Sequence, residues 1–207
     1  MEINATRVFL LAQIPHKEKN INQSAINDES KTFGDILQGT FVENYKNLTY
    51  KHLMGLKWAS TTCQDASFIL KVDDDTVYSL EKTYALLELV NDTTDFIMGY
   101  IHYDAKPLRY KKSKWYVTRD EYPRREYPPY LSGYYYITTP RVAAALCDEA
   151  IYHPYFWIDD IFVTGLLTES LGIELTRKPD TFSLDNYVNC NCCFVGIAPF
   201  HCPHPIP

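Results

Sequence analysis

The sequence lacks a long apolar run, and it also lacks an excess of positive charge. No apolar stretch in its 207 residues approaches the length needed to cross a bilayer, and residues 1–4 have no signal-peptide character. The formal net charge of -6 gives no electrostatic case for nucleic acid or an anionic membrane as a partner. Internal repeats and low-complexity linkers are absent too. We therefore expect residues 1–207 to form a single domain.

The composition is that of a globular protein. Apolar residues make up 46% of the chain and charged residues 22%, which argues against disorder. The length is sufficient for one domain with a sizeable core. Seventeen tyrosines are the one unusual count. Their amphipathic rings suit a carbohydrate-binding cleft, but packing in the core and at its rim is the default interpretation.

Three adjacent carboxylates, Asp73, Asp74 and Asp75, follow the apolar segment 66–72. They repel one another unless a cation neutralises them, and hard oxygen ligands suit Mg²⁺ or Mn²⁺. The carboxyl end of a strand in an α/β sheet is also where ligands bind. The alternative is a solvated acidic turn before a helix, because residues 79–90 have helical character. The triplet alone does not decide between a metal site and an acidic turn.

Sequons and cysteines indicate the compartment. Asn-x-Ser/Thr sequons begin at four positions, against about one or two expected by chance, and favour the secretory route. The candidate glycosylation sites are Asn4, Asn22, Asn47 and Asn91. Six cysteines agree with an oxidising compartment. Four of them crowd residues 190–202 near two histidines, so a zinc site is the alternative to disulfides.

The order of the apolar segments predicts an α/β fold. Segments 7–12, 66–72 and 95–100 have strand character, and segments 43–62 and 79–90 have helical spacing. This alternation is typical of a largely parallel sheet flanked by helices. Residues 20–30 are polar and indicate a loop, and residues 33–37 are too short and mixed to assign. Residues 101–130 indicate an extended meander, followed by a strand at 134–138 and helices at 140–150 and 160–171.

Four segments, in this order, resemble the β-1,3-glycosyltransferase family that includes the β-1,3-galactosyltransferases. The first covers residues 29–51, with an Asp-Ile pair and a Tyr-x-Asn-Leu-Thr-x-Lys core, and the second is residues 68–75, ending in the acidic triplet. The third runs from Lys-Trp-Tyr-Val at 114–117 to residues 127–136, and the fourth is residues 158–165, similar to the family's Glu-Asp-Val-Tyr-x-Gly block. Together they cover nearly the whole chain.

The chain also departs from the family pattern. Asp159-Asp160 stands where many members have Glu-Asp, and Leu131 stands where relatives often have a cysteine. The family's Arg-rich segment and its preceding strand have no counterpart before the strand near residue 8. The resemblance therefore implies a domain that lacks its N-terminal strand, stem and membrane anchor. The parent protein would be a type II membrane protein of the Golgi lumen.

The resemblance implies a GT-A-like (Rossmann-like) mixed sheet, and inverting transfer of a hexose from a UDP-sugar with Mn²⁺ (or Mg²⁺). It assigns Asp160 as the base that deprotonates the acceptor. Asp73 and Asp75, with His201, are the expected metal ligands, and Asp75 is the first choice for direct coordination. The expected substrate-binding residues are Lys71, Asp74, Trp115, Ser132, Gly133 and Asp159. For Lys71, pairing with the aspartates is an equal alternative to balancing phosphate charge. For Asp159 and Asp160, the alternative is capping of the helix that they begin.

Galactosyl transfer to a glycan in β-1,3 linkage is the function that the sequence favours. N-acetylglucosaminyl transfer is the close alternative, because small pocket differences decide the donor. An alternative of another class is a non-catalytic carbohydrate-binding relative. The expected partners are a nucleotide-sugar donor and a glycan acceptor on glycoprotein or glycolipid, with no nucleic acid.

Overall fold

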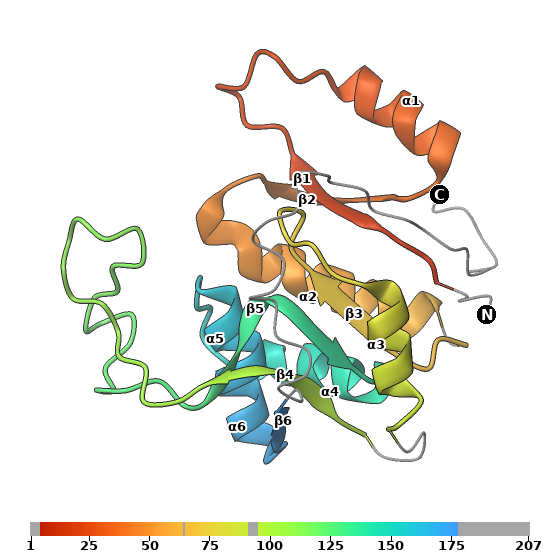
Figure 1. The fold of residues 1–207 in the computed structure, drawn as a ribbon. Helices are drawn as coiled ribbons and strands as arrows, with labels where there is room; N and C mark the ends of the chain where they lie inside the picture. The colour runs from red at the N-terminus through yellow and green to blue at the C-terminus, as the bar shows by residue number, and fades with distance from the viewer. Residues whose placement is uncertain (1–4, 64, 91–94, 178–207) are drawn as a thin grey trace.

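Two sheets organise the molecule. The computed structural model describes residues 5–63, 65–90 and 95–177 (Figure 1). The smaller sheet pairs β1 (Phe9–Gln13) in parallel with β2 (Ile36–Val42). The larger sheet has the order β3-β5-β4-β6, formed by β3 (Ile69–Val72), β5 (Tyr130–Thr138), β4 (Ile97–His102) and β6 (Leu175–Arg177). The predicted mixed α/β class is confirmed.

The expected predominance of parallel pairing is wrong for the larger sheet. Its strand β5 runs antiparallel to both β3 and β4, and only β4 and β6 are parallel. The chain leaves β4 and returns as β5 through residues 103–129, which contain no helix. A parallel return requires a crossover connection, usually helical, so β5 lies antiparallel beside β4.

Helices cover both faces of the larger sheet. One face packs against α2 (Leu48–Thr62), α4 (Pro140–Glu149) and the helix that starts at Asp159. The other face packs against α3 (Leu80–Leu87). Strand β5 serves both cores, because Tyr136 points into the first and Tyr135 into the second. The site residues at its start, Ser132 and Gly133, therefore stand on a strand fixed from both sides.

The predicted loop at residues 20–30 is wrong, because α1 (Gln23–Phe33) occupies most of it. This helix has no buried residue, so it lacks the apolar stripe from which a helix is predicted. The sequence features that indicate this helix lie at its two ends. The side chain of Asn22 accepts from the Ser24 N–H, and Gly34 ends the helix at φ 66°.

The other predicted helices are confirmed with small shifts. Segment 43–62 forms η1 (Tyr45–Asn47) and then α2, and segment 140–150 forms α4 and η2 (Ala150–Tyr152). The final helix joins α5 (Asp159–Ile161), the π-helical η3 (Phe162–Leu166) and α6 (Leu167–Leu171), and ends at Gly172 as expected. Among the described helices, none combines the length and the apolar character that a membrane span requires.

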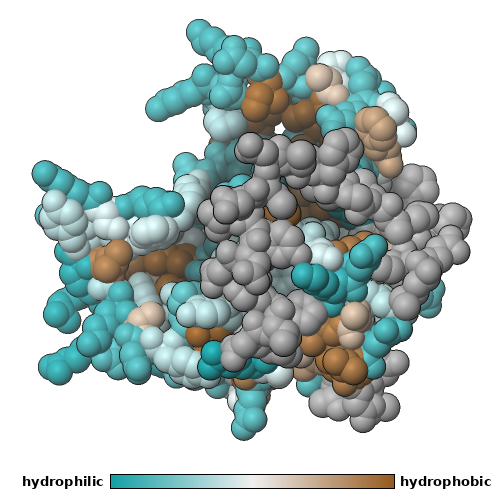
Figure 2. Space-filling view, viewed as in Figure 1, coloured by the Kyte–Doolittle hydropathy of each residue, from teal (hydrophilic) through white to brown (hydrophobic). Residues whose placement is uncertain are grey.

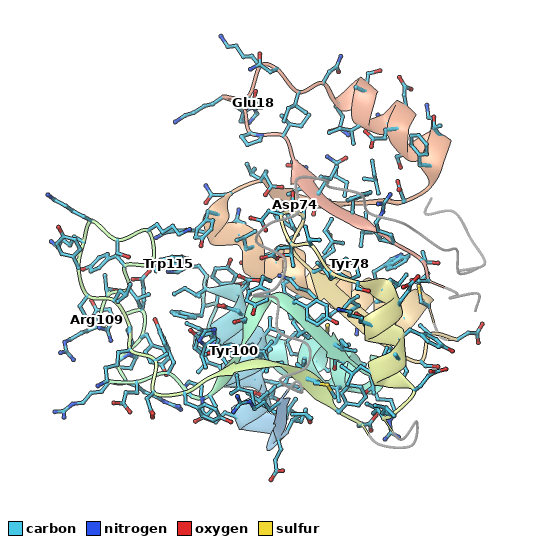
Figure 3. All side chains as sticks on the ribbon, in the orientation of Figure 1. Glu18, Asp74, Tyr78, Tyr100, Arg109 and Trp115 are labelled. Carbon is cyan, nitrogen blue, oxygen red and sulfur yellow. The ribbon has the colours of Figure 1, made fainter. Side chains whose placement is uncertain are left out.

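The meander predicted near residues 101–130 is confirmed as an irregular segment at 103–129 that projects from the body (Figure 1). The guanidinium of Arg109 holds it together by donating to the carbonyls of Val117, Thr118, Tyr122 and Arg124 at 2.6–3.2 Å (Figure 3). Figure 2 shows mainly hydrophilic residues on the outer part of this projection. Val117, Tyr122 and Tyr127 of this segment are buried in the core shared with α2 and α4, so the segment is held both by Arg109 and by packing against the body.

Candidate functional site

A cleft of about 1490 Å³ collects the site residues predicted from the sequence. Its walls come from β1, α2 and β3, from the turn after β3, from the start of β5 and from residues 157–161. Every expected metal, base or substrate residue within the described chain lines this cleft: Lys71, Asp73, Asp74, Asp75, Trp115, Ser132, Gly133, Asp159 and Asp160. These residues lie up to 89 positions apart in sequence, from 71 to 160, so the fold brings them together.

The acidic triplet occupies the turn that follows β3, with Asp74 labelled in Figure 3. Asp73 is half-buried, whereas Asp74 and Asp75 are exposed. The Asp73 N–H donates to the carbonyl of Tyr134 at 3.0 Å, which continues the β3–β5 pairing into the turn. The helix α3 begins later, after Ser79, whose side chain caps it. The triplet therefore does not serve as the N-cap of that helix.

Lys71 ties the acidic turn to β5. Its ammonium group donates both to Asp73 Oδ1 and to the carbonyl of Gly133. Of the two alternatives for this lysine, the structure contains the pairing with an aspartate. This contact also fixes the backbone of Gly133 relative to the triplet, and its positive charge lies near Asp159 and Asp160.

Asp160 lines the same cleft at the first turn of α5, beside Gly133. Its Oδ1 accepts the Ile161 N–H at 2.8 Å, and its carbonyl accepts the Thr164 hydroxyl at 2.7 Å. Burial raises the pKa of the Asp160 carboxyl to about 6, and the negative charge of Asp159 acts in the same direction. A carboxylate with this pKa can take up a proton near neutral pH.

Asp159 lines the cleft and binds α2. Its Oδ2 lies 2.9 Å from Nδ1 of His52, whose Nε2 lies 2.6 Å from the hydroxyl of Tyr136. Burial alone would raise the pKa of Asp159, but the His52 hydrogen bond and the charge of Lys71 outweigh it, so that pKa is lowered. Ile158 is the N-cap residue of α5 and makes no side-chain cap. The capping alternative therefore does not account for Asp159.

Gly133 lets Asp160 approach β5. A Cβ at Gly133 would stand 3.1 Å from Asp160 Cβ and 3.6 Å from its Oδ2. From the sequence we expected this glycine to bind substrate, and that stays a prediction. In the structure, its missing side chain makes room for Asp160.

Ser132 is buried beside Gly133. Its hydroxyl lies 2.5 Å from Nε2 of His102, whose ring stacks on Tyr130. Burial lowers the pKa of His102, which favours the neutral ring. The hydroxyl of Ser132 is therefore held in place at the cleft wall by a neutral imidazole.

Trp115 stands at the rim of the cleft with its ring partly exposed. Its Nε1–H donates to the Tyr45 hydroxyl at 2.9 Å, and the Lys114 ammonium lies 4.3 Å from its ring centroid (Figure 3). The Tyr45 ring in turn lies 6.1 Å from the buried ring of Trp157. Trp115 is not a core residue, because 45% of it is exposed. An exposed aromatic ring beside a cleft can stack on the apolar face of a sugar.

Several predictions fall on residues 1–4, 64, 91–94 and 178–207, which lie outside the described chain. Among them are the metal ligand His201, the sequons at Asn4 and Asn91, and the cysteine cluster. Within the described residues, no three histidine, cysteine or acidic side chains converge as a ready metal site. Cys63 is disulfide-bonded, whereas Cys147 is a free thiol.

The two described sequons differ in accessibility. Asn22 is exposed and caps α1 through its oxygen. Asn47 is half-buried, and its Nδ2 donates to the Val42 carbonyl at 2.8 Å. Glycans attach at Nδ2, so Asn22 suits that attachment better than Asn47 in the folded protein.

The sequence analysis missed His52, Tyr136 and His102. A signal for His52 was present, because it lies four residues from both Leu48 and Leu56 and so falls on the apolar stripe of its helix. A polar residue there predicts a buried side chain that needs a partner. The identity of that partner, 107 residues away, had no local signal.

A family model described as Galactosyltransferase matches residues 1–179. The chain belongs to the galactosyltransferase family. Curated relatives agree with this assignment. Beta-1,3-galactosyltransferase 5 of Homo sapiens is 37% identical over 160 residues, which is 76% of this chain and 51% of the relative. Beta-1,3-galactosyltransferase 1 of Mus musculus is 34% identical over 174 residues, which is 83% of this chain and 52% of the relative.

This member of the galactosyltransferase family spans about half the length of the curated relatives it matches. The matched part includes the four segments on which the resemblance rested. The family assignment thus agrees with the resemblance from which the acidic residues of the cleft were predicted.

The contact between Gly133 and Asp160 gives a test of this geometry. In Gly133→Ala, the new methyl group would push Asp160 by a few tenths of an ångström. If Asp160 takes part in catalysis, we expect the rate of that reaction to fall about tenfold, because small displacements of a catalytic group are costly. Turnover and thermal melting, measured together, check this. The double variant Gly133→Ala/Asp160→Asn should be no slower than Asp160→Asn alone, and an additive loss would contradict the shared mechanism.

Proposed function

We propose that this chain is the catalytic part of an inverting β-1,3-galactosyltransferase that uses a UDP-hexose donor. The observation that carries the proposal is the one cleft that both the acidic triplet and Asp160 line, with Lys71 and Gly133 between Asp73 and Asp160. The family assignment and the names of the relatives support galactosyl transfer. The layered sheet with helices on both faces is compatible with a GT-A-type fold, which is part of this proposal.

The triplet is the proposed diphosphate end. Asp73 and Asp75 offer hard carboxylate oxygens, the donor type that suits Mn²⁺ or Mg²⁺. A metal held by one or two carboxylates takes its other ligands from substrate phosphates and water. Asp75 is exposed on the turn, and Asp73 keeps one oxygen on Lys71, so the residues present fit such an ion. When bound, the ion would supply charge stabilisation for the departing UDP.

Asp160 is the proposed base. Inversion by direct displacement needs one group that accepts the acceptor hydroxyl's proton on the face opposite the leaving nucleotide. Asp160 meets the chemical requirement, because burial and the charge of Asp159 raise its pKa to about 6. It remains largely ionised at neutral pH and yet has a proton affinity above that of an ordinary carboxylate. Asp74, Trp115, Ser132 and Gly133 line the same cleft, in which the donor and acceptor sugars would lie.

Galactose is the proposed donor sugar, and N-acetylglucosamine is the competing one. The named relatives are galactosyltransferases, which favours galactose. The proposal extends to a membrane-anchored parent in the Golgi lumen, with a glycoprotein or glycolipid acceptor. The disulfide at Cys63 is compatible with an oxidising compartment.

The test is turnover of UDP-galactose and UDP-N-acetylglucosamine, each with Mn²⁺ and a panel of glycans with different terminal sugars. We expect UDP release that depends on acceptor, is faster with UDP-galactose, and gives a β-1,3-linked product by NMR. Binding of glycans without any UDP release would favour the non-catalytic carbohydrate-binding alternative. Preference for UDP-N-acetylglucosamine would overturn the donor assignment alone.

A further inference from the structure

His52 is a buried histidine to which the proposed reaction assigns no role. It lies on α2 in the wall of the cleft, with only 4% of its surface exposed. Both of its ring nitrogens have partners: Tyr136 on β5 at 2.6 Å and Asp159 on α5 at 2.9 Å. Burying a histidine costs free energy unless its ring nitrogens are hydrogen-bonded. The two hydrogen bonds of His52 meet this requirement.

The partners define the proton positions on the ring. Burial raises the pKa of the Tyr136 phenol well above its ordinary value, so its O–H is retained and donates to Nε2 of His52. In the neutral ring, the proton then resides on Nδ1 and is donated to the Asp159 carboxylate. The result is a directed chain of hydrogen bonds from Tyr136 through His52 to Asp159.

The surroundings keep His52 neutral and Asp159 charged. Burial lowers the pKa of His52, with Lys71 acting in the same direction and Asp159 and Asp73 opposing. Around the acidic pair, the facing charged group is Lys71 on β3, and the facing neutral titratable group on α2 is His52. On β5, Tyr136 contacts His52 and Tyr130 lies near Asp160.

Helix α2 holds the segment before Asp160 at two points one turn apart. The hydroxyl of Thr49 donates to the Phe156 carbonyl at 2.7 Å, and His52 binds Asp159. Thr49 and His52 are three residues apart and therefore lie on the same face of the helix. The segment that leads to Asp159 and Asp160 is thereby fixed to a helix.

We propose that His52 is a positioning residue that, through its Nδ1–H, keeps Asp159 ionised and oriented and so sets the proton affinity of Asp160. This inference rests on the proposed role of Asp160 as the base. Asp160 itself would contact the acceptor, whereas His52 acts only through Asp159. No bond in His52 forms or breaks, and its proton stays on Nδ1 throughout the transfer.

The first test is made on the unaltered protein without substrate. Nitrogen-15 NMR of the imidazole reports the tautomer directly. We expect the neutral Nδ1–H form of His52 to persist through the pH range in which free histidine titrates. A neutral Nε2–H ring, or a ring that gains a second proton in that range, would overturn the inference. This result does not depend on whether the protein transfers a sugar.

The second test compares His52→Leu with His52→Asn. Asparagine can present an amide N–H where Nδ1 stood, whereas leucine cannot. In His52→Leu we expect kcat to fall by about tenfold to a hundredfold, with the KM for donor unchanged and the acid limb of the pH profile shifted to lower pH. The shift arises because Asp159 would take up a proton first and no longer raise the proton affinity of Asp160. His52→Asn should recover the position of that limb. Equal losses in both variants, with the limb unmoved, would overturn the inference.

Tyr136→Phe tests the other end of the hydrogen-bond chain from Tyr136 to Asp159, and Tyr135→Phe is its matched control. Both tyrosines are buried on β5, but the Tyr135 hydroxyl pairs with Thr83 in the opposite core. Only Tyr136→Phe should shift the acid limb and the imidazole signals. The unaltered protein could show no sugar transfer and yet show the Nδ1–H tautomer of His52 and, by carbon-13 NMR, a raised pKa of Asp160. In that case the proposed function fails and the inference on His52 stands.

Discussion

Asp160→Asn should reduce galactosyl transfer by about a hundredfold to ten-thousandfold while leaving nucleotide binding intact. The amide keeps the size of the carboxylate but cannot accept the acceptor's proton. It retains an oxygen for the Ile161 N–H, so α5 should begin at the same place. The acidic triplet makes no hydrogen bond to the Asp160 side chain among the described contacts and should be unaffected. The measurements are initial rates at saturating donor and UDP binding by calorimetry.

Asp148→Asn is the matched control for that variant. Asp148 is an exposed carboxylate on α4 that pairs with the exposed Lys57 at 3.0 Å. Surface pairs of this kind contribute little to stability, so rate and melting temperature should hardly change. If Asp160→Asn lost UDP binding together with transfer, Asp160 would have a structural role and the base assignment would be contradicted.

Asp75→Ala has the second large expected effect. If Asp75 holds the ion that offsets charge on the departing UDP, its loss should reduce transfer by about a hundredfold or more, since several kcal/mol of transition-state stabilisation are involved. The apparent affinity for Mn²⁺ should fall as well. Removal of metal with EDTA should produce a similar loss in the unaltered protein, reversed when Mn²⁺ is added back. Turnover titrated with Mn²⁺ measures both quantities.

Asp28→Ala controls for removing one surface carboxylate. Asp28 is exposed on α1 and does not line the cleft. Its loss should leave the Mn²⁺ dependence unchanged. Undiminished turnover in Asp75→Ala, or in EDTA, would show that the triplet is an acidic turn rather than a metal site.

The sequence predicted the elements of the fold better than their pairing. Apolar spacing and end signals found α2 and the helix from Asp159 to Gly172, because their stripes face a core. Apolar spacing did not predict α1, because this helix has no buried residue. Apolar spacing did not predict the direction of β5 either. That direction depends on the path of residues 103–129 between β4 and β5, and no periodic sequence pattern encodes this path.

Local motifs identified the site, but not its internal contacts. Asp73 and Asp160 stand in short segments whose residue order is informative by itself. The contact of Gly133 with Asp160, and of His52 with Asp159, joins segments far apart in sequence. Burial and charge at those contacts produce the pKa of Asp160, and neither is visible in a linear sequence.

The pH dependence of kcat/KM tests most directly the claim that Asp160 is the base. Below a pKa of about 6 an increasing fraction of Asp160 is protonated and unable to accept a proton, so activity should fall as pH decreases through that value. The residual activity of Asp160→Asn should show no such acid limb. An unaltered limb in Asp160→Asn would contradict the account, because the titrating group would then be another residue.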